Sequence, residues 1–254
     1  MSVRLPELAV LVPGEPFPPL DQTWPDNSPA PGLLAIGGAL DAPTLLAAYR
    51  HTVFPWFNAD EPILWWSTNP RMVLHPDRLR LHRSLRKTIQ RFRADARCQI
   101  HFNTAFDQVI AACAAMQRPG QNGTWIGPEM QAAYIQLHAA GHAHSVETWV
   151  DGQLVAGLYL VSIGQAVFGE SMFTQVSDGS KIALAALVAF CRMHGLPLID
   201  CQQNTEHLAF MGAQEMPRDD FAQHVQALTA LPAPVWKFDP VYWNAILPTS
   251  THPP

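Results

Sequence analysis

Apolar and polar positions repeat with a helical period through the first half of the chain. Apolar residues recur three or four positions apart, which places them on one side of a helix. The pattern predicts helices at residues 41–56, 82–93, 104–116 and 127–141. Asp41 is suited to cap the first of these helices, and Pro43 to stand in its first turn.

Beyond residue 143 the period becomes that of strands. Residues 144–150, 153–164 and 165–173 predict a meander, with a tight hairpin at Asp151–Gly152. A buried helix at 180–195 and a strand at 196–202 follow. Strand, helix and strand in this order predict a right-handed crossover and at least one parallel pair. Asp200 and Gln202 would then stand at the C-terminal end of a strand, where open α/β sheets place their sites.

The prolines predict the domain organisation. Residues 1–32 are proline-rich and are expected to form an irregular arm, and residues 61–76 read as extended segments broken by prolines. A helix is expected at 218–228, with a tail after it. We therefore expect a mixed α/β (α+β) fold, with a small N-terminal domain at 1–69 and a larger domain with a mixed sheet at 70–254.

Composition narrows the class of protein. A chain of 254 residues with 48% hydrophobic content can bury a substantial core. No stretch reaches the roughly 18 apolar residues of a membrane helix, and the start of the chain lacks the pattern of a signal peptide. The four cysteines form no CxxC pair and no zinc spacing. These features predict a cytoplasmic protein with free thiols and no membrane partner.

The basic residues gather in one region although the net charge is -5. Nine of the sixteen lysines and arginines lie between Arg71 and Arg97, where only Asp77 and Asp95 oppose them. Such a stripe is typical of a phosphate-binding surface. The alternative is a solvated helix face that acidic neighbours balance in three dimensions.

Several common sites lack their motifs. "GESMF" is not the GxSxG of a serine nucleophile, and the phosphate loop GxxxxGK[ST] is absent. "LHAAGHAH" brings three histidines together without HExxH or a matching carboxylate, so no metal site is predicted.

Glu170 is a more promising candidate. Strand alternation would place Phe168 and Met172 on its own face, so the carboxylate would meet apolar neighbours. A carboxylate in an apolar cleft needs a cation or hydrogen-bond donors, which favours a functional role over an outward-pointing side chain. Trp56 and Trp125 stand beside proline or glycine, where they could pack or could stack on nucleobases.

Six motifs in order resemble one known family. "LLAIGGAL", "LLAAYRHTVFPWF", "PILWWSTNPRMVL", "GTWIGPEMQAAYIQLHAAGHAHSVETW", "FGESMF" and "LIDCQ" are similar to the leucyl/phenylalanyl-tRNA–protein transferases, over roughly residues 31–225. The resemblance implies a cytoplasmic bacterial enzyme with a GNAT-like larger domain and no metal or organic cofactor. It would move leucine or phenylalanine from charged tRNA to the N-terminal arginine or lysine of a protein, marking that protein for the N-end rule. A monomer is expected.

The resemblance also assigns residues. By motif, Asp200 would orient Gln202, whose carbonyl oxygen would receive the incoming amine, and Glu170 would bond the terminal groups of the charged tRNA. An aminoacyl ester is already activated, so positioning can supply much of the rate. Trp56 and Trp125 match the aromatic residues around the terminal adenosine and the aminoacyl side chain. The apolar pocket would be formed by Ile199, with Leu158, Phe168 and Met172 as further candidates.

The basic stripe would hold the acceptor arm through its phosphates. The residues assigned to it are Arg71, Arg78, Arg80, Arg83, Arg86, Lys87 and Arg91. One departure from the family pattern is Leu158, which stands where methionine is expected. The choice of donor among leucine, phenylalanine and methionine therefore stays open.

Two other functions have to be compared. An acetyl-CoA-dependent N-acetyltransferase would need a [QR]-x-x-G-x-[GA] loop, which is not found in this sequence. A non-catalytic tRNA-binding protein would explain the arginines but would leave Glu170, Asp200 and Gln202 without a role.

Overall fold

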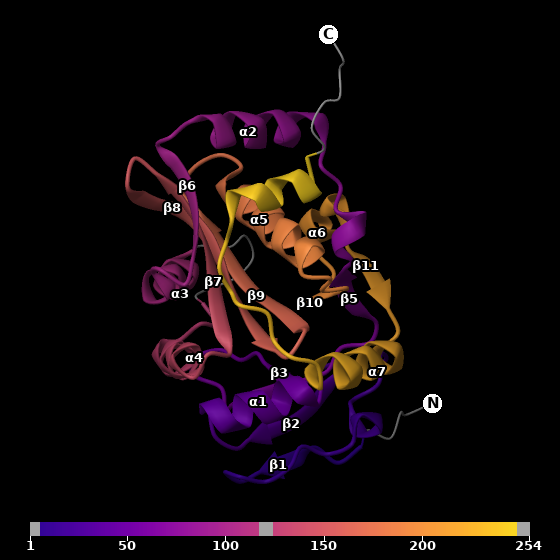
Figure 1. Ribbon diagram of the computed structural model, residues 1–254. Coiled ribbons are helices and arrows are strands. Elements are labelled where there is room, and N and C mark those ends of the chain that lie inside the picture. The colour runs from indigo at the N-terminus through magenta and orange to yellow at the C-terminus, as the bar shows by residue number, and fades with distance from the viewer. Residues whose placement is uncertain (1–5, 117–123, 248–254) are drawn as a thin grey trace.

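The computed structural model describes residues 6–116 and 124–247, and it has the mixed α/β class that the sequence predicts (Figure 1). The smaller of its two sheets has the strand order β1-β2-β4-β3. Its strands are β1 (Ala9–Leu11), β2 (Leu33–Gly37), β3 (Phe54–Pro55) and β4 (Leu64–Trp66). Helix α1 (Ala42–Arg50) lies beside this sheet, and the Asp41 side chain accepts a hydrogen bond from the Thr44 amide as the expected cap.

The larger sheet has seven strands in the order β11-β5-β10-β9-β8-β7-β6. They are β5 (Arg71–Leu74), β6 (Cys98–Phe102), β7 (Ala143–Val150), β8 (Gln153–Ile163), β9 (Ala166–Thr174), β10 (Ile199–Gln202) and β11 (Gln214–Met216). Strands β9 and β10 run parallel and are joined through α5 (Gly179–Met193), which confirms the predicted strand–helix–strand unit. This unit brings "LIDCQ" beside "FGESMF".

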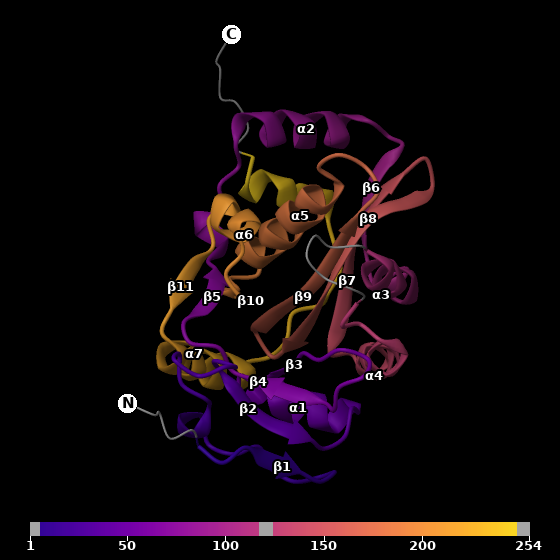
Figure 2. The same cartoon turned by 180° about the vertical axis from the view of Figure 1, so that it is seen from behind.

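Helices cover both faces of the larger sheet (Figure 2). Helices α3 (Phe106–Ala115) and α4 (Pro128–Ala139) lie on one side, and α5 lies on the other. The remaining helical segments are α2 (Arg83–Ala94), α6 (Glu206–Met211), α7 (Arg218–Thr229) and the 3-10 turns Leu20–Gln22, Pro76–Arg78 and Pro240–Ala245. Among the described residues, no helix is long and apolar enough to cross a membrane.

One hydrophobic core joins the two sheets. Leu34 and Trp65 of the small sheet belong to the same buried cluster as Val73 of β5 and Phe168 of β9. Along the chain, the last strand of the small sheet ends at Trp66 and the first strand of the larger sheet begins at Arg71. The division of the chain at residue 69 therefore stays a prediction.

The structure departs from the predicted elements at two places that bear on the site. The first helix ends at Arg50 and does not extend to residue 56, because Thr52 takes a φ of 61° and breaks the helical backbone. The chain then turns into β3, which carries Phe54 towards the site. Helix α6 was not predicted, and it forms because Thr205 caps its start and Gly212 ends it in the left-handed conformation.

Candidate active site

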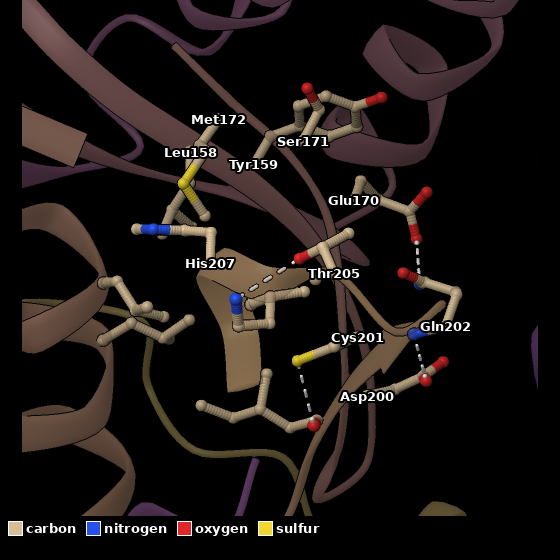
Figure 3. Close-up of a pocket in the computed structure, with 15 residues that line it drawn as sticks. Leu158, Tyr159, Glu170, Ser171, Met172, Asp200, Cys201, Gln202, Thr205 and His207 are labelled. Atoms are coloured by element: carbon tan, nitrogen blue, oxygen red, sulfur yellow. Dashed lines mark hydrogen bonds between the residues drawn. The ribbon is translucent and has the colours of Figure 1, made fainter. Parts of the chain in front are cut away.

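Two cavities meet where β10 ends, and Figure 3 shows the residues that line the first of them. The first, the apolar cavity, has a volume of about 230 Å³, and Leu158, Met172, Leu184, Leu187 and Ile199 contribute to its walls. The second, the tryptophan cavity, has a volume of about 260 Å³ and is lined by Phe54, Trp56 and Trp125. Glu170, Cys201, Gln202, Thr205 and Leu208 line both cavities. The predicted polar residues therefore stand at a junction between two compartments.

Asp200 is held by a buried ion pair. The Arg71 guanidinium donates from Nε to Oδ1 at 2.8 Å and from Nη2 to Oδ2 at 2.7 Å, and both side chains are almost fully buried. Arg71 also donates from Nη1 to the Thr52 carbonyl at 3.2 Å, and it lies between the rings of Phe54 and Phe221. A bidentate pair of this kind fixes the carboxylate in both position and orientation.

The prediction that Arg71 binds tRNA phosphates is wrong. Its side chain is 0% exposed, so no phosphate on the surface can reach it. Arg71 precedes a run of buried residues in β5, and its charge satisfies Asp200 on the neighbouring strand.

Gln202 projects into the site from an irregular end of β10. The pairing of β10 with β5 shifts register between Asp200 and Gln202, and Gln202 takes a φ of 53°. Its amide N–H donates to Asp200 Oδ1 at 2.9 Å, and its carbonyl accepts from Thr68 Oγ1 at 3.0 Å. Asp200 thus orients Gln202 through the main chain, and the side-chain amide is left to act in the cavities.

Glu170 completes the cluster and connects to two tyrosines that sequence reasoning missed. Its Oε2 accepts from the Tyr134 hydroxyl at 3.0 Å, and Tyr134 in turn is hydrogen-bonded to the Tyr49 hydroxyl. Its Oε1 lies 3.5 Å from Gln202 Nε2. Burial raises the pKa of Glu170 to about 7, although the hydrogen bonds from the tyrosines act in the opposite direction. A carboxyl group with this pKa can both take up and release a proton near neutral pH.

The prediction that Phe168 and Met172 share a face of the strand with Glu170 is wrong. Tyr159 pairs with Ser171 whereas Leu160 pairs with Gly169, so Glu170 is an extra residue on β9. The bulge reverses the parity, and Phe168 and Met172 lie on opposite sides of the sheet. Phe168 is fully buried against Tyr49 in the core, outside both cavities, so its prediction as a pocket residue is not supported.

The other predicted pocket residues lie at the junction. Leu158, Met172 and Ile199 line the apolar cavity, and Trp56 and Trp125 line the tryptophan cavity. Trp66 supports Trp56, because its Nε1 donates to the Trp56 carbonyl at 2.7 Å.

The sequence analysis also missed residues that line the apolar cavity from helices distant along the chain. Leu184 and Leu187 come from α5, and His207 and Leu208 come from α6. Leu184 and Leu187 stand three positions apart within the predicted helix at 180–195, but that spacing alone indicates only a buried face. The common helix signals, a threonine at the start and a glycine after the last residue, were available in the sequence for α6.

The remaining basic residues lie at the surface. Arg83, Arg86, Lys87 and Arg91 are exposed along α2, and Arg78 and Arg80 are exposed just before it. Arg78 donates to the Gln214 side chain. Helix α2 lies at the opposite end of the molecule from β1 in both views. Within the described residues, no three His, Cys, Asp or Glu side chains form a group that could hold a metal ion.

Comparison with known proteins identifies the family. The family model for the "Leucyl/phenylalanyl-tRNA protein transferase" matches residues 73–226, and that for its N-terminal domain matches residues 38–69. A Polaromonas protein named leucyl/phenylalanyl-tRNA–protein transferase is 57% identical over 237 residues, covering 93% of each chain. The protein of that name from Albidiferax ferrireducens is 55% identical and covers 97% of each chain.

Solved structures give weaker likenesses. A GCN5-related N-acetyltransferase from Kribbella flavida has a TM-score of 0.34 and 12% identity, and covers 68% of this chain and 60% of its own. A score of this size carries no argument about the activity. The sequence comparisons decide the question, and the chain belongs to the leucyl/phenylalanyl-tRNA–protein transferase family. It is an aminoacyltransferase.

Proposed function

We propose that this chain moves leucine or phenylalanine from charged tRNA to the N-terminal arginine or lysine of a protein. It does so as a cytoplasmic monomer without a cofactor, and the product enters the N-end rule pathway of degradation. The observation that carries the proposal is the cluster of Glu170 and Gln202 at the junction of the two cavities, with Asp200 beneath it.

The two cavities match the two parts of a charged 3′ end. The apolar cavity takes the aminoacyl side chain, since leucine, isoleucine and methionine side chains form its walls. The tryptophan cavity takes the terminal adenosine, since Trp56 and Trp125 offer faces on which a base can stack. The ester between these two parts then lies beside Glu170 and Gln202.

The reaction is aminolysis of an ester. The amine nitrogen forms a bond to the ester carbonyl carbon, and the bond from that carbon to the ribose oxygen breaks. The side-chain oxygen of Gln202, Oε1, accepts a hydrogen bond from the amine, because the side-chain nitrogen Nε2 already faces Glu170. The free α-amine has an ordinary pKa of about 7.7–8.0, close to that of Glu170. Glu170 receives the proton that the amine loses and returns it to the departing ribose oxygen.

The test is transfer of labelled leucine or phenylalanine to a peptide that begins with arginine. A peptide that begins with alanine is the acceptor control. We expect transfer to the arginine peptide alone, and a fall in kcat of about 10²-fold or more for Gln202→Ala, Asp200→Asn and Glu170→Ala. Gln153→Ala, at an exposed hairpin position, is the matched control and should retain full activity.

Other outcomes would point to other functions. Full activity in all three variants would move the site away from the end of β10. Acetylation of the same peptide in the presence of acetyl-CoA would favour the N-acetyltransferase. Tight tRNA binding without transfer from leucyl-, phenylalanyl- or methionyl-tRNA would favour the binding protein.

A further inference from the structure

A pair of stacked rings, one exposed and one half-buried, lies between the basic helix and the site. Phe210 of α6 is 54% exposed, an unusual position for a large aromatic side chain. The His82 ring stacks on it with a centroid distance of 4.0 Å and an interplanar angle of 19°. The His82 Nε2 also lies 3.3 Å from the Phe210 carbonyl oxygen. These two rings, with Arg78, Arg80 and Arg83 around them, are called the aromatic ridge below.

The ridge is rigidly attached to the wall of the site. The Arg80 amide donates to the Met211 carbonyl at 2.9 Å. The chain is packed so closely here that a Cβ added at Gly212 would lie 2.3 Å from the Arg78 carbonyl oxygen. The same short helix carries Leu208, which lines both cavities. Helix α6 therefore has the site at one side and the ridge at another.

The charge around the ridge matches a polyanion. Between residues 77 and 87 the chain carries five arginines or lysines and one acidic residue, Asp77. In the part of the chain that the structure describes, Arg78, Arg80 and Arg83 form no ion pair. All three residues are exposed, and of the three Arg78 already donates a hydrogen bond to the Gln214 side chain, so positive charge is presented to phosphates at this surface.

The position of the aromatic ridge places it on the path of a tRNA that runs from α2 to the tryptophan cavity. Figures 1 and 2 both place α6 between α2 and β10. A tRNA held on α2 with its terminal adenosine in the tryptophan cavity has to cross α6. Exposed rings flanked by arginines are the usual platform for single-stranded nucleic acid.

We infer that the aromatic ridge binds the single-stranded 3′ end of the donor tRNA. An unpaired base upstream of the terminal adenosine stacks on Phe210, and Arg78, Arg80 and Arg83 contact the phosphates beside it. This inference rests on the proposed function. It assigns to Phe210 and His82 the task of delivering the charged end from the basic helix to the cavities.

The test compares variants of Phe210 with two donors. With phenylalanyl-tRNA as donor, we expect the KM of Phe210→Ala to rise about 5- to 20-fold, the effect of losing one base stack. Phe210→Leu keeps the apolar bulk without the ring and should show the same rise, whereas Phe210→Tyr should keep a KM close to that of the wild type. Val10→Ala is the matched control, since Val10 is 69% exposed on β1 at the far end of the molecule.

The second donor is phenylalanyl-adenosine, which is too short to reach the ridge. The ratio of the Phe210→Ala KM to the wild-type KM should return to about one with this donor. An equal rise with both donors would mean that Phe210 acts through α6 on the cavities, and would overturn the inference. Equal KM values for Phe210→Ala and Val10→Ala with phenylalanyl-tRNA would overturn it as well.

Direct binding separates this inference from the proposed function. If the wild type transfers from neither donor, the proposed function fails, and the ridge is then judged by the Kd for uncharged tRNA. Weaker binding by Phe210→Ala and Phe210→Leu, but not by Phe210→Tyr, would support the ridge. Equal binding by all four proteins would overturn it.

Discussion

At the scale of single residues, the main feature of the site is a carboxyl group, that of Glu170, whose pKa burial raises to about 7. Glu170 is an extra residue in a bulge of β9, which turns it towards Tyr134 and Gln202. The nearby positive charge of Arg71 lowers its pKa and the negative charge of Asp200 raises it, but both effects are smaller than that of burial. The pKa that the proposed proton transfer needs is therefore obtained at a cost to the stability of the fold.

The substitution Glu170→Gln tests this cost. Below the ordinary pKa of 4.5 the carboxyl is protonated in both states, so wild type and variant should differ little. As the pH rises to about 7 the unfolded chain ionises while the folded chain keeps its proton, which weakens the wild-type fold. The variant cannot ionise, so at pH 8 its free energy of unfolding should exceed that of the wild type by about 2–3 kcal/mol.

Urea unfolding at pH 4.5, 6 and 8 measures this difference. Exposed Glu7→Gln serves as the control and should show no pH-dependent gain. A constant difference across the three pH values would contradict the raised pKa of Glu170. Transfer activity of the variant should fall, because the amide cannot carry the proton.

At the scale of elements, the site is assembled by one ion pair that ties three strands together. Arg71 belongs to β5 and Asp200 to β10, and Arg71 also bonds the Thr52 carbonyl just before β3. This arrangement places Phe54 and Trp56 opposite Gln202. Sequence patterns located the meander and the polar end of β10 correctly, but they assigned Arg71 to the surface because it opens a run of arginines.

The variant Arg71→Met should show that the Arg71 guanidinium both positions the Asp200 carboxylate and balances its charge. Removing the guanidinium leaves a buried carboxylate without its cation, which should lower the free energy of unfolding by about 3–5 kcal/mol. The double variant Arg71→Met/Asp200→Asn removes both charges and should recover much of that loss. Its kcat should stay low, because the Gln202 main chain has lost its charged acceptor.

Urea unfolding and peptide transfer measure the two effects separately. A double variant that is no more stable than Arg71→Met would show that the ion pair is not what the fold requires at this position. Arg71→Lys keeps the charge without the fork and should fall between wild type and Arg71→Met in both measurements.

At the scale of the whole molecule, a C-terminal segment closes the core of the larger sheet over a neutral histidine. Trp236 stacks on His144 of β7 at 4.6 Å and on Phe190 of α5. Burial, with smaller contributions from His138 and His142, lowers the pKa of His144 from 6.5 to about 3. The folded state therefore favours the uncharged imidazole at this contact.

The contribution of His144 to the free energy of unfolding should accordingly fall as the pH drops below 6.5. Above this pH the imidazole is neutral in both states, whereas below it the unfolded chain binds a proton that the folded chain excludes. His144 should cost about 1.4 kcal/mol of unfolding free energy for each pH unit between 6.5 and 3. His207 acts in the same direction and Glu170 in the opposite one, so the observed slope is their sum.

The variant His144→Phe isolates this contribution. Its ring can still stack on Trp236, but it cannot bind a proton. The free energy of unfolding of the variant, taken relative to that of the wild type at the same pH, should rise as the pH falls from 7 to 5, because only the wild type carries the His144 contribution. A difference between variant and wild type that stays constant across this pH range would contradict the lowered pKa of His144.

The sequence by itself determined most of the helices, although not α6 or the end of α1, together with the meander, the parallel β9–β10 unit and the family. Each of these follows from a local period, a cap, or motifs that stand in order along the chain. It also located Glu170, Asp200 and Gln202, because polar residues at the end of an apolar strand are visible without a fold.

Only the tertiary structure decided how those residues act. The Arg71–Asp200 pair spans 129 positions, and the Tyr134–Glu170 bond spans 36, so no local pattern contains them. The bulge at Glu170 reversed the parity that alternation predicts, since one extra residue turns every following side chain of a strand to the other face. Burial of a charge and the meeting of two cavities are properties of the packed chain, and they arise only when distant elements come together.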